Sequence, residues 1–167
     1  APDLFTDEML DVIKNAKKGK FQFEAGIQSL NNETLSAIGR ICDNEKAFSN
    51  LKKIISFGNV NVHTDIIAGL PKENFESFKK SFNDVLSLKP HVLQLGFLKL
   101  LKGSAMRNEC DEYDISYREN APYEIISNKF ISADELIFLK DVDFCFDKLY
   151  NSSSFVKTFD FLFGKYD

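Results

Sequence analysis

The sequence is poor in residues that bind metals. It contains three cysteines and two histidines in 167 residues, and Cys42, Cys110 and Cys145 lie far apart in the chain. None has the spacing of about two to four residues that builds zinc and iron–sulfur sites. The chain is therefore predicted to hold no metal itself, and its cysteines are expected to be reduced, partly buried thiols, as in cytoplasmic proteins.

Three further features are missing. No segment approaches the roughly 18 consecutive apolar residues of a membrane span, and the start APDLFTDEM has neither the basic residues nor the apolar core of a secretion signal. Lysine and arginine form no run longer than a short pair, and the net charge is −4, so no basic surface for nucleic acid is expected. These absences predict a cytoplasmic protein that binds neither membrane nor nucleic acid.

Three segments of alternating polar and apolar residues are predicted as β-strands, and stretches of helical periodicity separate them. Strands are expected at 21–28, 60–67 and 91–98, and helices at 6–18, 31–41, 46–57 and 75–88. Strands that alternate with helices are typical of a parallel sheet, so the predicted fold class is α/β. After Gly103 the alternation of strands and helices ends, and short extended segments are followed by helices near 132–150 and 154–163. We therefore predict two domains, 1–108 and a mainly helical 109–167.

Polar and apolar side chains are expected on opposite faces of this sheet, because successive residues of a strand point in opposite directions. The polar face would hold Gln22, Glu24, Gly26, Gln28, Asn61, His63, Asp65, Gln94 and Gly96. Strands buried on both faces are normally apolar throughout, and closed barrels fill their interior with branched aliphatic residues. The pattern favours a partial (half) TIM-like β/α barrel with a polar, ligand-holding lumen. The alternative is a sheet with one face simply exposed to solvent.

Four polar residues are candidates for binding a ligand. Gln28 and Asp65 fall near the carboxyl ends of their strands, and Gln94 faces the same side, where parallel α/β proteins bind ligands. Asp65 can accept hydrogen bonds from hydroxyls or an amine, and Gln28 can both donate and accept. Arg40, at the end of the first crossover helix, has a planar fork that suits a carboxylate.

The order of several short motifs resembles that of radical S-adenosylmethionine enzymes. These motifs are GIQS at 26–29, IGR ending at residue 40, DIIAGLP at 65–71 and LQLGFLKLLKGSAM at 93–106. The segments PYEIISNKFISADELIFLK and YNSSSF are similar to the accessory region that follows the barrel in one subgroup of the cobalamin-domain branch, which consists of iron–sulfur oxidoreductases. Together the motifs cover the chain from about residue 20 to residue 160.

The resemblance implies a cofactor and a reaction. It implies that Gln28 and Arg40 contact S-adenosylmethionine, with Arg40 on the methionine carboxylate, and that Asp65 approaches the ribose. In such enzymes a [4Fe-4S] cluster cleaves the sulfonium reductively, and the resulting 5′-deoxyadenosyl radical abstracts hydrogen from a substrate. The substrate expected here is a small molecule or one of unknown class. Cobalamin is implied as a further cofactor of the longer protein. The sequence identifies no catalytic residue.

The chain departs from the family in several respects. The CxxxCxxC motif that holds the cluster is absent, and the first strands of the barrel and any cobalamin-binding domain are also missing. The resemblance begins midway through the barrel, so we expect a piece of a longer enzyme with no radical activity of its own. The unpaired strand edge of such a piece is expected to support dimerisation. Two alternatives stay open: a lyase or isomerase that uses Glu24, His63 and Asp65 as acid–base groups, and a non-catalytic binding module.

Overall fold

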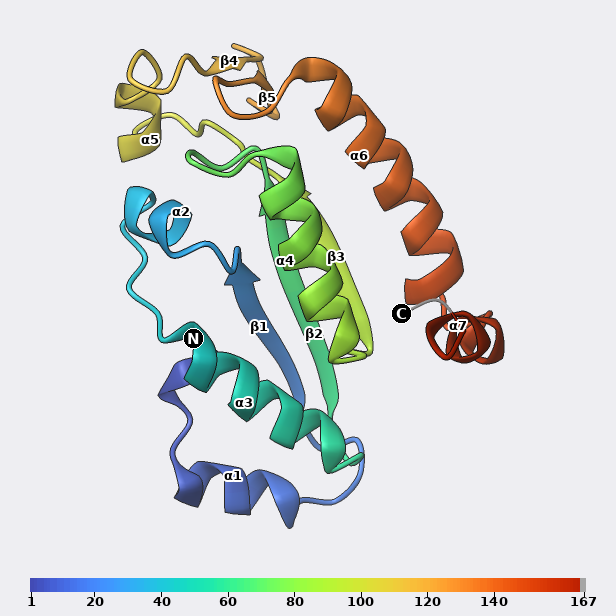
Figure 1. Cartoon of the computed structure of the whole chain (residues 1–167). Coiled ribbons are helices and arrows are strands. Elements are labelled where there is room, and N and C mark those ends of the chain that lie inside the picture. The colour runs from blue at the N-terminus through green and yellow to red at the C-terminus, as the bar shows by residue number, and fades with distance from the viewer. Residues whose placement is uncertain (166–167) are drawn as a thin grey trace.

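A three-stranded parallel sheet forms the centre of the protein. The structure is a computed structural model that describes residues 1–165, and its strands are ordered β1-β2-β3 (Figure 1). They are β1 (Gln22–Gln28), β2 (Asn61–Ala68) and β3 (Val92–Phe97), and every boundary lies within one residue of the expected segment. The predicted α/β class with parallel strands is confirmed.

Helices precede the first strand and connect the strands, and the two longest of them cover one face of the sheet (Figure 1). These helices are η1 (Pro2–Leu4), α1 (Asp7–Lys14), α2 (Asn32–Ala37), α3 (Asn44–Ser56) and α4 (Phe75–Ser87). Figure 1 shows α3 and α4 in front of the strands, with α1 beside α3. The side chain of Asn74 accepts a hydrogen bond from the backbone N–H of Ser77 at 2.9 Å and so begins α4. Such caps satisfy backbone donors that the helix leaves unpaired, and they fix where the helix starts.

Burial along the strands alternates as the sequence predicts. On β2, Val62 and Ile66 have none of their surface exposed and belong to the apolar core under the helices. His63 and Asp65, which alternate with them, are half-buried on the opposite face. Because the helices cover the apolar face, the polar face is the one available to a ligand.

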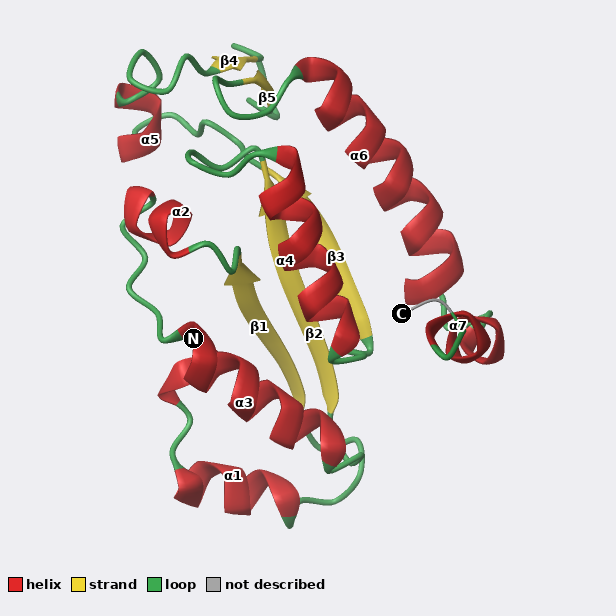
Figure 2. Ribbon diagram, in the orientation of Figure 1, coloured by secondary structure: helices red, strands yellow, loops and turns green. Residues whose placement is uncertain are grey.

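The C-terminal region caps the carboxyl end of the sheet. Its elements are α5 (Ala105–Asn108), β4 (Ser116–Tyr117), β5 (Ile125–Ser127), α6 (Ala133–Phe146), the π-helical turn η2 (Asp147–Asn151) and α7 (Val156–Phe163). In Figure 2, α5 and the two short strands lie beyond the strand ends, and α6 runs back along the β3 side of the sheet. The N–H of Leu100 donates to the carbonyl of Tyr123 at 2.8 Å, and the N–H of Ile125 donates to Leu98 at 2.9 Å. Across residues 1–165, no helix is long and apolar enough to cross a membrane.

Two consecutive residues of η2 fasten this region to the sheet. The side-chain amide of Asn151 accepts a hydrogen bond from the N–H of Leu93 at 3.0 Å and donates one to its carbonyl at 3.1 Å. The hydroxyl of Tyr150 donates to the carbonyl of Pro90 at 2.5 Å. Burial and the negative charge of Asp160 raise the pKa of Tyr150 to about 12, so the hydroxyl remains a donor even in mildly alkaline solution. Asn151 thus occupies a position on the β3 edge that a neighbouring strand would otherwise use.

Helix α2 is shorter than predicted, and this moves Arg40 out of the helix. Periodicity predicted a helix to residue 41, whereas α2 ends at Ala37. Gly39 has a φ of 68°, and the N–H of Arg40 donates to the carbonyl of Leu35 at 2.9 Å. This geometry is the Schellman motif, which ends helices at a glycine in the left-handed conformation. Ile41, expected on the apolar face of the helix, is fully exposed as a result.

Candidate functional site

Three predicted polar-face residues form one row across the sheet. Gly26 pairs in register with Asp65, and Asp65 pairs with Gln94. Asp65 and Gln94 also line a depression of about 390 Å³ that extends along β3 to Lys99. Ligands of parallel sheets bind at the carboxyl ends of the strands. This row is therefore the centre of the candidate site.

Gln28 reaches this row because β1 is irregular at its carboxyl end. The pairing shifts between Gly26 and Gln28, so that Gln28 lies opposite Ile66 and Ile27 is left over as a bulge. Gln28 has a φ of 68°, and its side-chain Nε2 donates to Oδ2 of Asp65 at 2.5 Å. Bulges of this kind redirect side chains next to functional sites. Two of the predicted site residues are thus in direct contact.

Glycine is required at position 26 by this contact. A Cβ at Gly26 would lie 2.6 Å from Nε2 of Gln28 and 3.2 Å from Oδ1 of Asp65. Both distances are shorter than ordinary van der Waals contact, and the amide of Gln28 would have to move. The absence of a side chain at Gly26 therefore keeps the Gln28–Asp65 pair together and leaves space beside it.

Arg40 joins the site from the loop after α2. Its Nη2 donates to the carbonyl of Gly26, which lies in the same strand row as Asp65. Its Nε is buried and, among the described residues, has no hydrogen-bond partner. A buried donor without a partner is costly, so an acceptor such as a carboxylate would be favoured there. Arg40, Gln28 and Asp65 therefore meet around Gly26.

Asp65 is partly shielded from water in this setting. Burial raises the pKa of Asp65, the hydrogen bond from Gln28 and the positive charge of Arg40 oppose that rise, and the negative charge of Glu24 adds to it. The bond from Gln28 occupies Oδ2, which leaves Oδ1 to accept from a ligand. The site can thus offer a carboxylate acceptor, an amide and a guanidinium within one small region.

Other residues of the polar face lie deeper or further out. Glu24 and His63 are register partners one residue pair below Asp65, where Glu24 is exposed and His63 half-buried. Nδ1 of His63 lies 3.5 Å from the amide of Gln22. Exposed Gln94 lines the depression beside Asp65. The structure therefore leaves Glu24 and His63 outside the group around Gly26.

The described residues do not form a metal centre. Within residues 1–165, no group of three or more His, Cys, Asp or Glu side chains is placed to hold a metal ion. Cys42 and Cys110 are free and half-buried, as expected, whereas Cys145 is free and exposed, contrary to the expectation of partial burial. An iron–sulfur cluster does not fit these residues, and no electron-transfer step is assigned to them.

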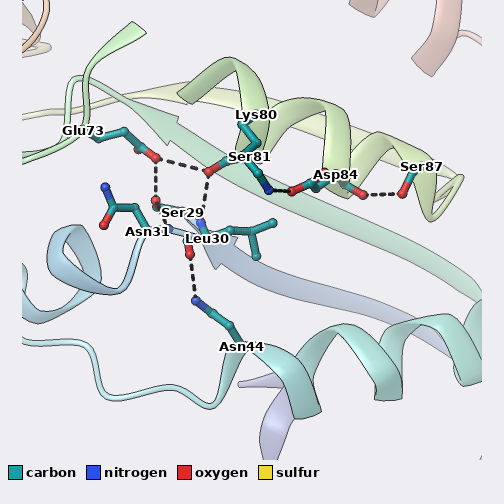
Figure 3. A network of polar contacts seen from close by, with 9 residues as sticks. All are labelled: Ser29, Leu30, Asn31, Asn44, Glu73, Lys80, Ser81, Asp84 and Ser87. Carbon is teal, nitrogen blue, oxygen red and sulfur yellow. Dashed lines mark hydrogen bonds and ion pairs between the residues drawn. The ribbon is translucent and has the colours of Figure 1, made fainter. Parts of the chain in front are cut away.

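Two residues next to the site, Glu73 and Ser29, were not among the predicted site residues, although Ser29 ends the GIQS motif at 26–29. Ser29 directly follows Gln28, and its hydroxyl donates to Oε1 of Glu73 at 2.6 Å (Figure 3). Ser29 has none of its surface exposed and Glu73 has 1% exposed. The sequence signals were the serine that ends GIQS and a glutamate soon after the Gly69–Pro71 turn. Their contact joins residues 44 positions apart, so no local pattern indicates it.

Comparison with known families and proteins agrees with this geometry. The family described as the Radical SAM superfamily matches residues 1–85. A second family, a protein of unknown function (DUF4080), matches residues 111–167. The first match covers half of the chain and includes all three residues that meet around Gly26.

Several known proteins are similar to parts of the chain. An oxygen-independent coproporphyrinogen-III oxidase-like protein of Bacillus subtilis is 30% identical over 118 residues, which are 71% of this chain and 23% of that protein. A ribosomal protein uS12 methylthiotransferase of Bdellovibrio bacteriovorus is 29% identical over 135 residues, 76% of this chain and 29% of that protein. The chain thus spans less than a third of the length of these relatives.

Solved structures agree on the fold. Coproporphyrinogen III oxidase from Escherichia coli, a radical SAM enzyme, superposes with a TM-score of 0.59 at 21% identity and covers 88% of this chain and 30% of its own. A radical S-adenosylmethionine methyltransferase from Kitasatospora setae gives a TM-score of 0.57 at 19% identity and covers 66% of this chain and 21% of its own. These matches do not separate the cobalamin-domain branch from the rest, so that assignment stays a prediction. The chain belongs to the radical SAM superfamily.

Proposed function

We propose that this chain supplies the adenosyl side of an S-adenosylmethionine site in a radical enzyme. The observation that supports the proposal most directly is the meeting of Gln28, Asp65 and Arg40 around Gly26. Oδ1 of Asp65 would accept a hydrogen bond from a ribose hydroxyl, and Gln28 would hold Oδ2 in place. The bulge and the missing Cβ at Gly26 leave room for the ligand beside this pair.

Arg40 is assigned to the methionine carboxylate. Its guanidinium already donates to the Gly26 carbonyl, and its buried Nε lacks a partner among the described residues. A carboxylate oxygen would satisfy this donor with a charge-assisted hydrogen bond. The ribose would then be held by strand β2, and the amino-acid carboxylate of the same ligand by the loop after α2.

The radical chemistry itself belongs to the cofactor. S-adenosylmethionine supplies a 5′-deoxyadenosyl radical when an iron–sulfur cluster reduces its sulfonium. The residues of this chain bind the adenosyl group, orient it and exclude water from one side of it. The cluster, any cobalamin and the residues that contact substrate are assigned to the longer protein, and the substrate class is left open.

A binding titration tests the proposal. The 167-residue chain should bind S-adenosylmethionine and S-adenosylhomocysteine in calorimetric titrations, and Asp65→Asn should weaken both by about tenfold to a hundredfold, because a hydrogen bond to a charged group is lost. Gly26→Ala should fold and also bind more weakly, because the Cβ displaces the flexible end of Gln28. Glu24→Gln is the matched control, since it neutralises a carboxylate on the same face outside the group around Gly26. Equal affinity for Asp65→Asn and Glu24→Gln would contradict the assignment, as would a folded chain that binds neither ligand.

We also propose a location and a self-association surface. Cys42, Cys110 and Cys145 are free thiols, which supports a reducing, cytoplasmic location. Among the described residues, β1 has β2 as its strand neighbour on one side, and its other edge would accept a strand from a second copy. Sizing chromatography with light scattering should give a dimer whose fraction rises with concentration, and a monomer at all concentrations would contradict this surface.

A further inference from the structure

The backbone at Gln28 is held in an unusual conformation. Its φ is 68°, and the N–H of Ser29 donates to the carbonyl of Ile27 at 2.9 Å, which closes a three-residue turn around Gln28. Turns of this kind with a positive φ are rare and strained for residues other than glycine. Such strain persists only where the surrounding structure fixes the neighbouring residues. The residues that fix this turn therefore set the direction of the Gln28 side chain.

A buried carboxylate lies directly behind the turn. Oε1 of Glu73 accepts hydrogen bonds from the hydroxyls of Ser29 at 2.6 Å and Ser81 at 3.2 Å (Figure 3). The exposed fractions are 0% for Ser29, 1% for Glu73 and 3% for Ser81. Each hydroxyl also accepts a backbone N–H, that of Asn31 on Ser29 at 2.9 Å and that of Leu30 on Ser81 at 3.2 Å. The loop after β1 is thus wrapped around one carboxylate oxygen.

The carboxyl of Glu73 is connected to the backbone through two hydroxyls, because each hydroxyl that donates to Oε1 also accepts a backbone N–H. Burial raises the pKa of Glu73, and the side chains of Ser29, Ser81 and Ser77 oppose that rise. Its Oε2 is buried and has no hydrogen-bond partner among the described residues. A buried carboxyl with an unsatisfied oxygen lowers the stability of the fold, so its presence here points to a role other than stability. In this fold the carboxylate joins the loop after β1 to the segment that begins α4.

We infer that Glu73 is a positioning residue for the cofactor site, acting through Ser29 to hold the turn that aims Gln28 at Asp65. This inference rests on the proposed S-adenosylmethionine site. Glu73 does not touch the ligand; it fixes Ser29, and Ser29 fixes the backbone on the carboxyl side of Gln28. Without the Glu73–Ser29 bond the turn relaxes toward an unstrained φ, and the Gln28 amide leaves Oδ2 of Asp65.

Two serines provide a matched pair of variants. Ser29→Ala and Ser81→Ala each remove one hydroxyl from the same carboxylate oxygen at a buried position, so a purely structural network predicts similar effects on both stability and binding. Only Ser29 is adjacent to Gln28. We expect similar decreases in the thermal midpoint, but only Ser29→Ala should shift the side-chain amide signals of Gln28 in an ¹⁵N-labelled NMR spectrum. Ser29→Ala should also weaken S-adenosylhomocysteine binding by about fivefold to tenfold, and Ser81→Ala by less than about twofold.

Glu73→Gln and Glu73→Ala complete the experiment. An amide oxygen can still accept from Ser29, so Glu73→Gln should keep the Gln28 signals close to those of the parent chain, and Glu73→Ala should shift them as Ser29→Ala does. If Glu73→Ala does not fold, the comparison of the two serine variants still decides. Unchanged Gln28 signals in Ser29→Ala, or equal shifts in Ser29→Ala and Ser81→Ala, would overturn the inference. The NMR measurement needs no ligand, so failure of the parent chain to bind S-adenosylhomocysteine would contradict the proposed function and leave the test of Glu73 intact.

Discussion

Substitution of Gly69 by alanine should test whether the C-terminal region packs against the turn after β2. Gly69 has a φ of 87°, and a Cβ there would lie 3.0 Å and 3.1 Å from two side-chain carbons of Ile125. Ile125 is 3% exposed and belongs to β5. A left-handed conformation costs an alanine about 1–2 kcal/mol, and overpacking at a tight contact costs about 1–3 kcal/mol. The lower entropy of the unfolded chain offsets about 0.4–1 kcal/mol of this.

Gly69→Ala should therefore lower the free energy of unfolding by about 1–5 kcal/mol. Gly103→Ala is a close control, because Gly103 has a φ of 84° and a Cβ there would meet nothing within 4 Å. It should cost only about 1 kcal/mol. The assay is urea denaturation followed by circular dichroism, and in thermal melts each kcal/mol corresponds to about 2–4 °C.

A double-variant cycle isolates the contact. In an Ile125→Ala background the clashing carbons are gone, so the cost of Gly69→Ala should fall to that of Gly103→Ala. The docking of β5 on the turn after β2 would be refuted by equal costs for Gly69→Ala and Gly103→Ala in the parent chain. It would also be refuted if the cost of Gly69→Ala stayed the same without the Ile125 side chain.

Three further predictions concern the site and the sheet. Burial raises the pKa of Asp65, so the stability that its protonated form adds is present below pH 3.8 and is lost as the pH rises through the raised pKa. Affinity for S-adenosylmethionine needs the ionised carboxylate and should increase over the same pH range. Asp65→Asn should abolish both trends in pH-dependent melts and titrations. Asn151→Ala removes two hydrogen bonds to Leu93 and should cost about 1–3 kcal/mol in urea denaturation. A cost equal to that of the nearby exposed change Ser154→Ala would show that the amide does not support the edge. The 167-residue chain should form no 5′-deoxyadenosine, measured by chromatography, when it is incubated anaerobically with iron, sulfide, dithionite and S-adenosylmethionine. The reason is that no group of three metal-binding side chains lies within residues 1–165. Cluster-dependent cleavage would refute the assignment of the cluster to other residues.

Much of the sheet could be predicted from the sequence because alternation is a local signal. Residues such as Val62 and Asp65 sit on opposite faces for reasons contained within one strand. The same local logic placed Gln28 and Asp65 on one face near the strand ends. The direct contact between them depends on a bulge and a positive φ, which alternation does not encode.

The remainder could not be predicted, for identifiable physical reasons. The helix expected to run to residue 41 carried its stop signal in Gly39, but the periodicity of its apolar residues extended past that glycine. Glu73 is buried by partners 44 and 8 residues away, so nothing in its neighbourhood distinguished it from a surface glutamate. The amide of Asn151 likewise meets its strand partner across 58 residues.

The two edges of the sheet differ in whether their backbone groups are free to pair with a further strand. On β3, backbone groups of Leu93 are already used by the side chain of Asn151. On β1, the outer edge has no strand neighbour among the described residues. A strand added at β3 would have to displace the Asn151 side chain from Leu93, whereas a strand added at β1 would meet no such obstacle among the described strands.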